Sequence, residues 1–470
     1  MKNSTKLNFI YNSLYQLLAI FLPLVTTPYL SRVLGAEKIG IYSYSYSIAY
    51  YFSMFIILGL NNYGNRTIAM VKDNKNDLSK SFFSIYYMQL TCAVVVIALY
   101  MLYAYFISNK VITWILLIYI MSSAIDISWF FFGLEQFKLT VIRNTVIKIL
   151  STIAIFLFVK KSTDIYIYAF ILCVGYFLGP LMLWPFVKKN VYFCKVSKQD
   201  IISHFKPNLI MFLPVIAISL YKMMDKIMLG KMCNMSQVGY YENVEKVMQI
   251  PLALIGSLGT VMLPKMSNLI ANDKGHEVDR IIEKSIIFVM VISSALSFGI
   301  MGVADSFVPW FYGEEFYPCV ALFRILMPSC LFVAFANVIR TQFLIPNKKD
   351  SIYIFSVFLG AAVNLFINLI LIPKYASNGA AIGTLCAEAA VCIYQIFKVR
   401  NQLSIKKYVF NIIPFIIIGL VMYGIIVNIP QLSNAYLVDI LLKVLIGGLI
   451  YVSFSSIYLI RHSKKIERLS

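Results

Sequence analysis

The sequence predicts an all-α polytopic membrane protein with about fourteen transmembrane helices. Of its 470 residues, 60% are hydrophobic and only 13% are charged, and the mean hydropathy is +0.79. Charged residues make up about one quarter of an ordinary globular protein, so most of this chain requires a lipid environment. Apolar runs of about twenty residues, the length of helix that crosses about 30 Å of hydrocarbon, recur along the whole sequence.

Polar breaks divide the apolar sequence into fourteen predicted spans. The first apolar segment, from about Leu7 to Leu34, is too long for a cleavable signal peptide and predicts the first span. Charged residues interrupt the fifth and the eighth span. The spans are expected at 9–34, 40–60, 81–107, 112–132, 140–159, 165–187, 208–230, 238–262, 284–304, 317–339, 351–372, 376–397, 408–428 and 436–460.

The basic residues predict the orientation of these spans. If the amino terminus is cytoplasmic, 28 of the 41 Lys and Arg residues lie in inside segments and 7 in outside segments. Cytoplasmic loops of membrane proteins carry an excess of Lys and Arg. We therefore expect a multi-pass protein with both termini in the cytoplasm.

The first two spans can be aligned with spans seven and eight, which indicates an internal repeat. The matched positions are Leu22-Pro23 with Leu213-Pro214, Gly35 with Gly230, and Gly59 with Gly259. Repeats six spans apart share one membrane orientation and predict two pseudo-symmetric six-helix lobes around a central cavity. We expect an N-lobe at 1–190 (helices 1 to 6), a C-lobe at 191–400 (helices 7 to 12), and two extra C-terminal helices with a cytoplasmic tail at 401–470.

The remaining composition excludes several functions. The net charge of +20 is spread over short loops and builds no compact module, so it predicts topology and attraction to anionic membrane lipids rather than nucleic-acid binding. The eight cysteines show no metal-ligand spacing. No cluster of nucleophilic, acid–base or metal-ligating groups and no glycine-rich ATP loop is present. We expect a protein that is not an enzyme, with no catalytic residue, metal or cofactor.

Ionisable residues inside the spans are the candidates for function, because each costs at least roughly 2.5 to 3.5 kcal/mol to insert. Six of them flank one turn, at similar predicted depths in spans seven and eight: Lys222, Asp225, Lys226, Glu242, Glu245 and Lys246. Their charges balance, and each set of three follows i,i+3,i+4 spacing on one helix face. They predict either an ion-pair network between two helices or a gate whose pairs rearrange. We favour the gate, with Lys222 turning inward.

Four further charges lie deep in other spans. Asp126 on span four and Lys148 on span five either pair with each other or serve the cavity. Arg324 on span ten and Glu388 on span twelve have no partner within their own helix, and an unpaired charge in lipid is costly. Arg324 and Glu388 are therefore the stronger cavity candidates.

Four blocks of sequence carry a resemblance to a known family. They read NSLYQLLAIFLPLVTTPYLSRVLGAEKIGIYSYS at 12–45, DISWFFFGLEQFKLTVIRN at 126–144, LYKMMDKIMLG followed by VGYYENVEKV at 220–247, and GAAIGTLCAE at 379–388. In this order they resemble the bacterial polysaccharide (oligosaccharide) flippases of the Wzx type. That family belongs to the multidrug/oligosaccharidyl-lipid/polysaccharide exporter superfamily.

The resemblance implies an alternating-access transporter of the bacterial cytoplasmic (plasma) membrane. Its cargo would be an undecaprenyl-diphosphate-linked oligosaccharide repeat unit for capsule, exopolysaccharide or O-antigen. Lys and Arg bind phosphate, so the candidate ligands are Arg324, Lys222, Lys226, Lys148, Arg32 and Arg66. Candidates for gating, or for coupling to H⁺ or Na⁺, are Asp225, Glu242, Glu245, Lys246, Glu388 and Asp126. A glycan polymerase and glycosyltransferases are the implied protein partners.

Three other functions remain open at this point. A multidrug or organic-cation antiporter of the same superfamily would use acidic cavity residues such as Asp126 and Glu388. A lipid II flippase would share the cationic cavity. A membrane polymerase or ligase would carry a large external loop, whereas the longest predicted external connection here has about a dozen residues.

Overall fold

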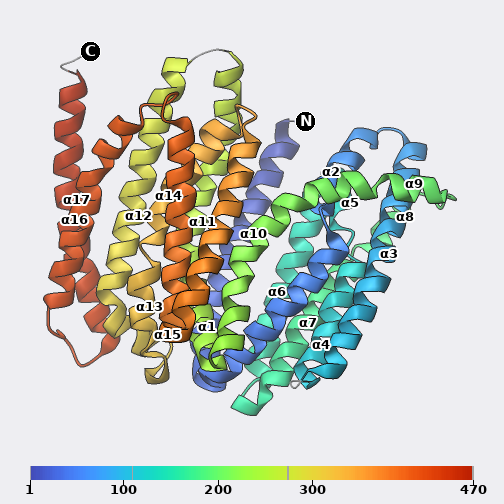
Figure 1. The fold of residues 1–470 in the computed structure, drawn as a ribbon, viewed down its shortest axis with the longest axis horizontal. Coiled ribbons are helices and arrows are strands. Elements are labelled where there is room, and N and C mark those ends of the chain that lie inside the picture. Colours follow the sequence, from blue (N-terminus) through green and yellow to red (C-terminus); the bar gives the residue numbers. More distant parts are fainter. Residues whose placement is uncertain (1, 108–109, 273–274, 468–470) are drawn as a thin grey trace. The chain divides into compact units, whose positions relative to one another are not determined.

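The structure of this chain is a computed structural model, and the regular secondary structure in the ranges that it describes is helical (Figure 1). It describes residues 2–107, 110–272 and 275–467, without the side chains of 2–20, 221–222, 275–276 and 461–467. Two compact units divide the chain, Met1–Gly230 and Lys231–Ser470. The predicted all-α class is thus confirmed.

Twelve helical stretches in the described ranges are long and apolar enough to cross a membrane. Two of them, Phe21–Val71 and Asp350–Val399, have 51 and 50 residues, about twice the length that one crossing needs. Each contains a residue with non-helical dihedrals: Gly35, with φ 74°, in α1 (Lys2–Ile57), and Ala376, with φ 48°, in α15 (Asp350–Val399). The sequence-based number of about fourteen therefore differs from twelve because it counts the two halves of α1 and of α15 separately.

Contacts along α15 show that its two halves fold back on each other. The Gln395 amide donates to the Ser356 hydroxyl at 2.9 Å. Nearer the bend, a Cβ atom on Gly379 would lie only 2.4 Å from the carbonyl oxygen of Leu371, so glycine is required there. The pairs 356 with 395 and 371 with 379 define an antiparallel hairpin around Ala376.

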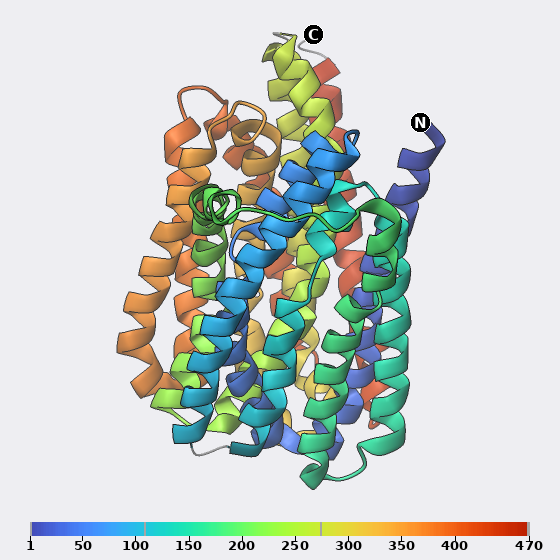
Figure 2. The ribbon, with the colours of Figure 1, turned by 90° about the vertical axis from the view of Figure 1, so that its right-hand side faces the viewer.

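Helices of the first unit pack against both halves of α1. The unit contains α1, α2 (Leu60–Val71), α3 (Lys75–Phe106), α4 (Lys110–Ala124), α5 (Ser128–Gly133), α6 (Phe137–Phe158), α7 (Ile165–Leu181), α8 (Trp184–Asn190), α9 (Lys198–Ser203) and most of α10 (Phe205–Met232). The Tyr29 hydroxyl donates to the carbonyl of Val159, after α6, at 2.6 Å. Past Gly35, Tyr46 packs on Tyr119 of α4, with ring centroids 5.1 Å apart. Figure 2 shows the long helices of this unit side by side.

The last helix of the first unit, α10, runs antiparallel to the second half of α1. Phe55 packs on Phe212 with ring centroids 5.5 Å apart, and the Tyr51 hydroxyl donates to the Ser219 carbonyl at 3.1 Å. The division into compact units accordingly falls in the last turn of α10, after Gly230. The lobe boundary near residue 190 stays a prediction.

The second unit is built on a shared apolar core. It contains α11 (Met235–Ala271), α12 (Gly275–Phe311), α13 (Cys319–Leu326), α14 (Ser329–Ile339), a π-helix (Arg340–Leu344), α15, α16 (Ile405–Asn428) and α17 (Tyr436–Glu467). Fully buried Met266, Ile282, Ile339, Val399 and Tyr408 join α11, α12, α14, α15 and α16 in this core. In Figure 1, α16 and α17 lie beside α12 at the carboxyl end of the chain.

Large apolar side chains are exposed on both units. Phe106 is 77% exposed and Phe410 is 74% exposed. Exposed apolar surface of this extent on long apolar helices is what a lipid-facing surface requires. The protein is a multi-pass membrane protein.

Candidate functional site

The Arg324 side chain has a partner on a neighbouring helix. Arg324 lies in the short helix α13, and its Nη2 atom is 2.5 Å from Oδ2 of Asp305 on α12. The side chains are 33% and 41% exposed, so the pair is accessible. Sequence reasoning found no partner for Arg324 within its helix and missed Asp305, because the predicted span 284–304 ends one residue before it.

The guanidinium of Arg324 is only partly used by this pair. Within the described part of the chain its Nε atom is buried and has no hydrogen-bond partner. A guanidinium carries five donors in a fixed fork that can hold a carboxylate or phosphate at two points. The arrangement therefore leaves Arg324 able to bind an anion with more acceptors than the Asp305 carboxylate.

A second polar contact lies at the next residue of α12. The Ser306 hydroxyl donates to Oδ2 of Asp439 on α17 at 2.5 Å. Asp439 also pairs with Lys443 at 3.1 Å, and these two side chains are 0% and 9% exposed. Sequence reasoning did not select them, although opposite charges at i,i+4 in an apolar segment were a usable signal.

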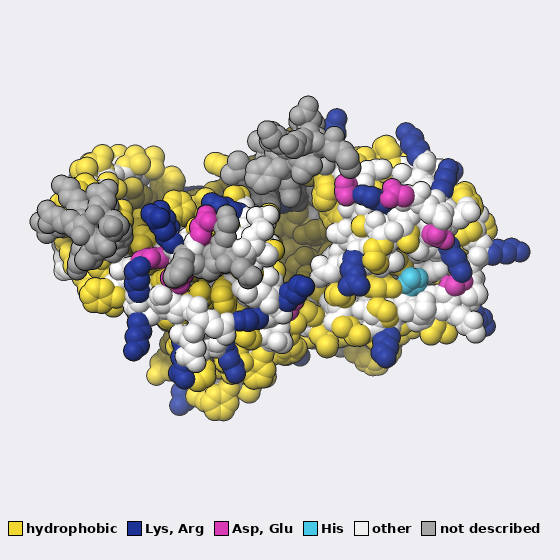
Figure 3. Space-filling view, turned by 90° about the horizontal axis from the view of Figure 1, so that it is seen from above, with side chains coloured by type: hydrophobic (Ala, Val, Ile, Leu, Met, Phe, Trp, Pro, Cys, Tyr) yellow, Lys and Arg dark blue, Asp and Glu magenta, His cyan; other side chains and the backbone are white. Residues whose placement is uncertain are grey.

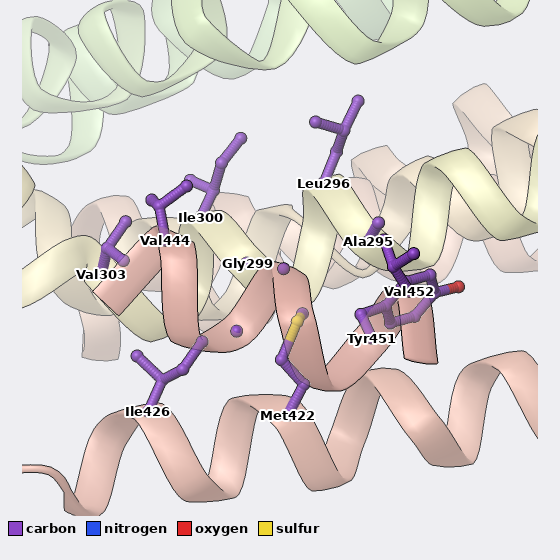
Figure 4. A pocket seen from close by; sticks show the side chains of 12 residues that line it. Ala295, Leu296, Gly299, Ile300, Val303, Met422, Ile426, Val444, Tyr451 and Val452 are labelled. Carbon is purple, nitrogen blue, oxygen red and sulfur yellow. The ribbon is translucent and has the colours of Figure 1, made fainter. Parts of the chain in front are cut away.

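An apolar cavity lies between α12, α16 and α17. One of its lining residues, Val444, follows Lys443 in the sequence. The cavity has a volume of about 230 Å³, and Gly299, Ile300, Met422, Ile426, Gly447 and Val452 are among its lining residues. Figure 4 shows aliphatic side chains from these helices around it, with the hydroxyl of Tyr451 at its edge. An apolar cavity of this kind accepts a hydrocarbon chain rather than a sugar or an ion.

In the first unit, Asp126 accepts hydrogen bonds from the first residue of the helix that follows it. Its Oδ1 atom accepts from the backbone N–H of Ser128 at 2.9 Å and from the Ser128 hydroxyl at 2.5 Å. Arg143 of α6, which is 8% exposed and was not selected from the sequence, donates to the same hydroxyl at 3.2 Å. The Asp126 carboxylate thus accepts two hydrogen bonds from Ser128, and its pairing with Lys148 stays a prediction.

The other predicted cations lie at different places in the first unit. Arg32 is exposed and donates to the Pro28 carbonyl of its own helix at 3.1 Å. Arg66 is exposed on α2, and Lys148 is half-buried on α6. Lys226 is 7% exposed on α10. The side chain of Lys222 lies outside the described residues.

The six charges around the turn at residue 230 fall into both units. Asp225, 1% exposed, belongs with Lys226 to the first unit. In the second unit Glu242 and Lys246 pair along α11 at 3.4 Å, with Glu245 half-buried beside them. Rearranging pairs between the two sets remain a prediction. Glu388 is half-buried in the second half of α15.

Basic and acidic side chains are mixed on the surface of the protein, as Figure 3 shows. One such pair, Lys72 with Glu135 at 2.8 Å, lies outside the candidate spans, and the hydrogen bond and charge of Glu135 raise the pKa of Lys72. No cluster of three or more His, Cys, Asp or Glu side chains that could hold a metal occurs among the described residues.

The fold of this multi-pass membrane protein resembles those of two solved transporters. The solved structure of the lipid II flippase MurJ in an inward closed conformation matches with a TM-score of 0.75 at 15% identity, covering 96% of this chain and 98% of that chain. An inward-facing multidrug resistance MATE family transporter of the MOP superfamily matches with a TM-score of 0.61 at 12% identity, covering 82% and 95%. The chain therefore shares the fold of these two proteins.

The sequence comparisons show the family. The model of the polysaccharide biosynthesis protein family matches residues 6–270, more than half of the chain. The chain belongs to this family, whose members are transporters rather than enzymes. A putative O-antigen transporter of Escherichia coli (strain K12) is 26% identical over 415 residues, which cover 85% of this chain and 98% of that protein.

Proposed function

We propose that this protein is a flippase that moves undecaprenyl-diphosphate-linked oligosaccharide repeat units across the cytoplasmic membrane for surface polysaccharide synthesis. The observation that carries the proposal is the similarity to an O-antigen transporter over 98% of that protein's length. Membership of the polysaccharide biosynthesis protein family and a fold similar to that of a lipid II flippase support it. Fourteen spans follow if α1 and α15 each cross twice, with both termini in the cytoplasm.

Arg324 is the proposed ligand of the diphosphate. Its side chain is one-third exposed, its Nε atom lacks a partner within the described chain, and a single carboxylate holds it. Arginine binds phosphate at two points with charge-assisted hydrogen bonds. Lys226, which is more buried, and the half-buried Lys148 are second choices, and Arg32 and Arg66 are exposed.

The apolar cavity is the proposed contact for part of the lipid tail. It lies between three helices of the second unit and is lined almost wholly by apolar atoms. A prenyl chain consists of apolar groups that need no hydrogen-bond partner, so it fits this lining. The glycan and diphosphate would then be handled by polar groups while the tail stays in an apolar environment.

Deletion of the gene tests the proposed function. The deletion strain is expected to lose surface polysaccharide and to accumulate lipid-linked repeat units, and re-expression of the wild-type chain restores export. Normal surface polysaccharide in a strain with no second flippase would contradict the proposal. Intact glycan export with increased drug sensitivity would instead indicate a multidrug antiporter.

A further inference from the structure

The carboxylate of Asp305 occupies the position at which an anionic ligand of Arg324 would bind. Its Oδ2 atom lies 2.5 Å from Nη2, and both side chains are accessible. We propose that Asp305 is a built-in competitor of the substrate diphosphate: it holds the guanidinium when no substrate is bound and is displaced by phosphate oxygens. The inference rests on the proposed function, because it takes Arg324 as the headgroup ligand.

Charge balance explains why a competitor is needed. A cation without a partner in a membrane protein is costly, and the carboxylate neutralises Arg324 between transport events. A diphosphate carries more negative charge and more acceptor oxygens than one carboxylate, and it can engage the guanidinium at two points. Asp305 engages one nitrogen and leaves Nε without a partner within the described chain. The diphosphate therefore makes the stronger complex, and Asp305 weakens its net affinity.

The backbone around Asp305 is held in place, so the exchange requires only side-chain rotation. The adjacent Ser306 donates to Asp439 at 2.5 Å, and Asp439 pairs with Lys443 at 3.1 Å. These contacts tie this turn of α12 to α17. The Asp305 side chain, 41% exposed, is the member of the site that would move in this exchange.

The proposed topology indicates at which step of transport Asp305 competes with the diphosphate. The pair lies near the end of α12 that precedes a predicted outside connection, which is the side where the substrate leaves. A carboxylate that reclaims Arg324 there promotes release of the diphosphate. Removal of the carboxylate is expected to tighten binding and to slow turnover.

Binding of farnesyl diphosphate to the full-length protein in nanodiscs tests the inference, with farnesol as the ligand that lacks the diphosphate. Asp305→Asn is expected to bind farnesyl diphosphate at least fivefold more tightly than the wild type, and Arg324→Gln at least tenfold more weakly. The double variant is expected to bind like Arg324→Gln, because the gain requires the arginine. Glu314→Gln is the control for loss of one negative charge in the same region. The Glu314 carboxylate accepts from Tyr436 at 2.9 Å, and Tyr436 lies on α17, the helix that Ser306 contacts through Asp439.

The outcomes separate this inference from the proposed function. If Asp305→Asn binds farnesyl diphosphate as tightly as the wild type or more weakly, Asp305 does not compete with the diphosphate. The ion pair would then be purely structural. An equal gain in Glu314→Gln would also overturn the inference, because the effect would then be general electrostatics. If both the wild type and Asp305→Asn bind farnesyl diphosphate and farnesol equally, Arg324 does not bind the diphosphate. That result would overturn the headgroup site and the proposed role of Asp305 together.

Discussion

Arg324 of α13 and Asp305 of α12 form an ion pair with Nη2 and Oδ2 2.5 Å apart. It joins two helices of the second unit while both side chains remain accessible. Exposed ion pairs contribute about 0 to 1 kcal/mol to stability. This pair therefore contributes little to the stability of the helix packing. Its accessible arginine is better suited to binding an anion than to holding the two helices together.

The apolar cavity is tested by filling it. A Cβ atom on Gly448, which lines the cavity, would meet no atom within 4 Å, and the same holds for Gly424, which is not among the lining residues. Gly448→Phe is expected to reduce crosslinking to a photoreactive prenyl diphosphate by about threefold, a modest factor because the tail leaves lipid rather than water. Equal crosslinking of Gly448→Phe and the control Gly424→Phe would place the tail elsewhere.

The buried pair of Asp439 and Lys443 is expected to matter for stability. Removal of one partner leaves an uncompensated buried charge, which costs about 3 to 5 kcal/mol. Asp439→Asn should therefore lower the thermal unfolding temperature of the protein in detergent, and the double variant Asp439→Leu/Lys443→Met should recover most of the loss. A double variant as unstable as Asp439→Asn would show that packing, rather than charge pairing, governs this contact.

Gln342 in the π-helix is expected to destabilise the described conformation. Its side chain is 0% exposed, and neither amide atom has a hydrogen-bond partner within the described chain. An unsatisfied buried polar group costs about 1 to 3 kcal/mol, so replacement by methionine, which has a similar shape, should raise the unfolding temperature.

Gln89 provides the matched control for Gln342. Its amide donates to the carbonyls of Ser123 and Asp126 at 2.7 and 2.9 Å and accepts from Trp129 at 3.1 Å. Gln89→Met is therefore expected to lower the unfolding temperature. An equal destabilisation by Gln342→Met would contradict this account, because it would mean that the Gln342 amide is hydrogen-bonded in the folded protein.

The lengths of the apolar runs predicted the helices well because the thickness of the hydrocarbon layer sets the length of each span. The break near Gly35 was also predictable, since glycine readily adopts positive φ. Ala376 gave no such indication, because alanine rarely adopts positive φ. The break between spans eleven and twelve was predicted from the polar residues near it instead. Breaks were thus expected near both positions, but the structure has a bend within one long helix at each of them rather than a loop between two helices.

The candidate site was less predictable than the fold. Depth along a helix can be counted from sequence, but the rotation of each helix against its neighbours depends on packing. Asp305 was missed because it falls just outside an apolar run, and Arg143 because its partner Ser128 lies across a helix break. Asp439 and Lys443 could have been found from their spacing alone.

The measurement that tests the central claim most directly is transport by Arg324→Ala and Lys110→Ala at equal membrane levels. Lys110 is exposed at the start of α4 in the other unit. Loss of a charge-assisted hydrogen bond costs about 1.5 to 3 kcal/mol, so Arg324→Ala should export lipid-linked oligosaccharide at least about tenfold more slowly than the wild type. Lys110→Ala should match the wild type. Equal export by the two variants would contradict the assignment of Arg324 to the diphosphate.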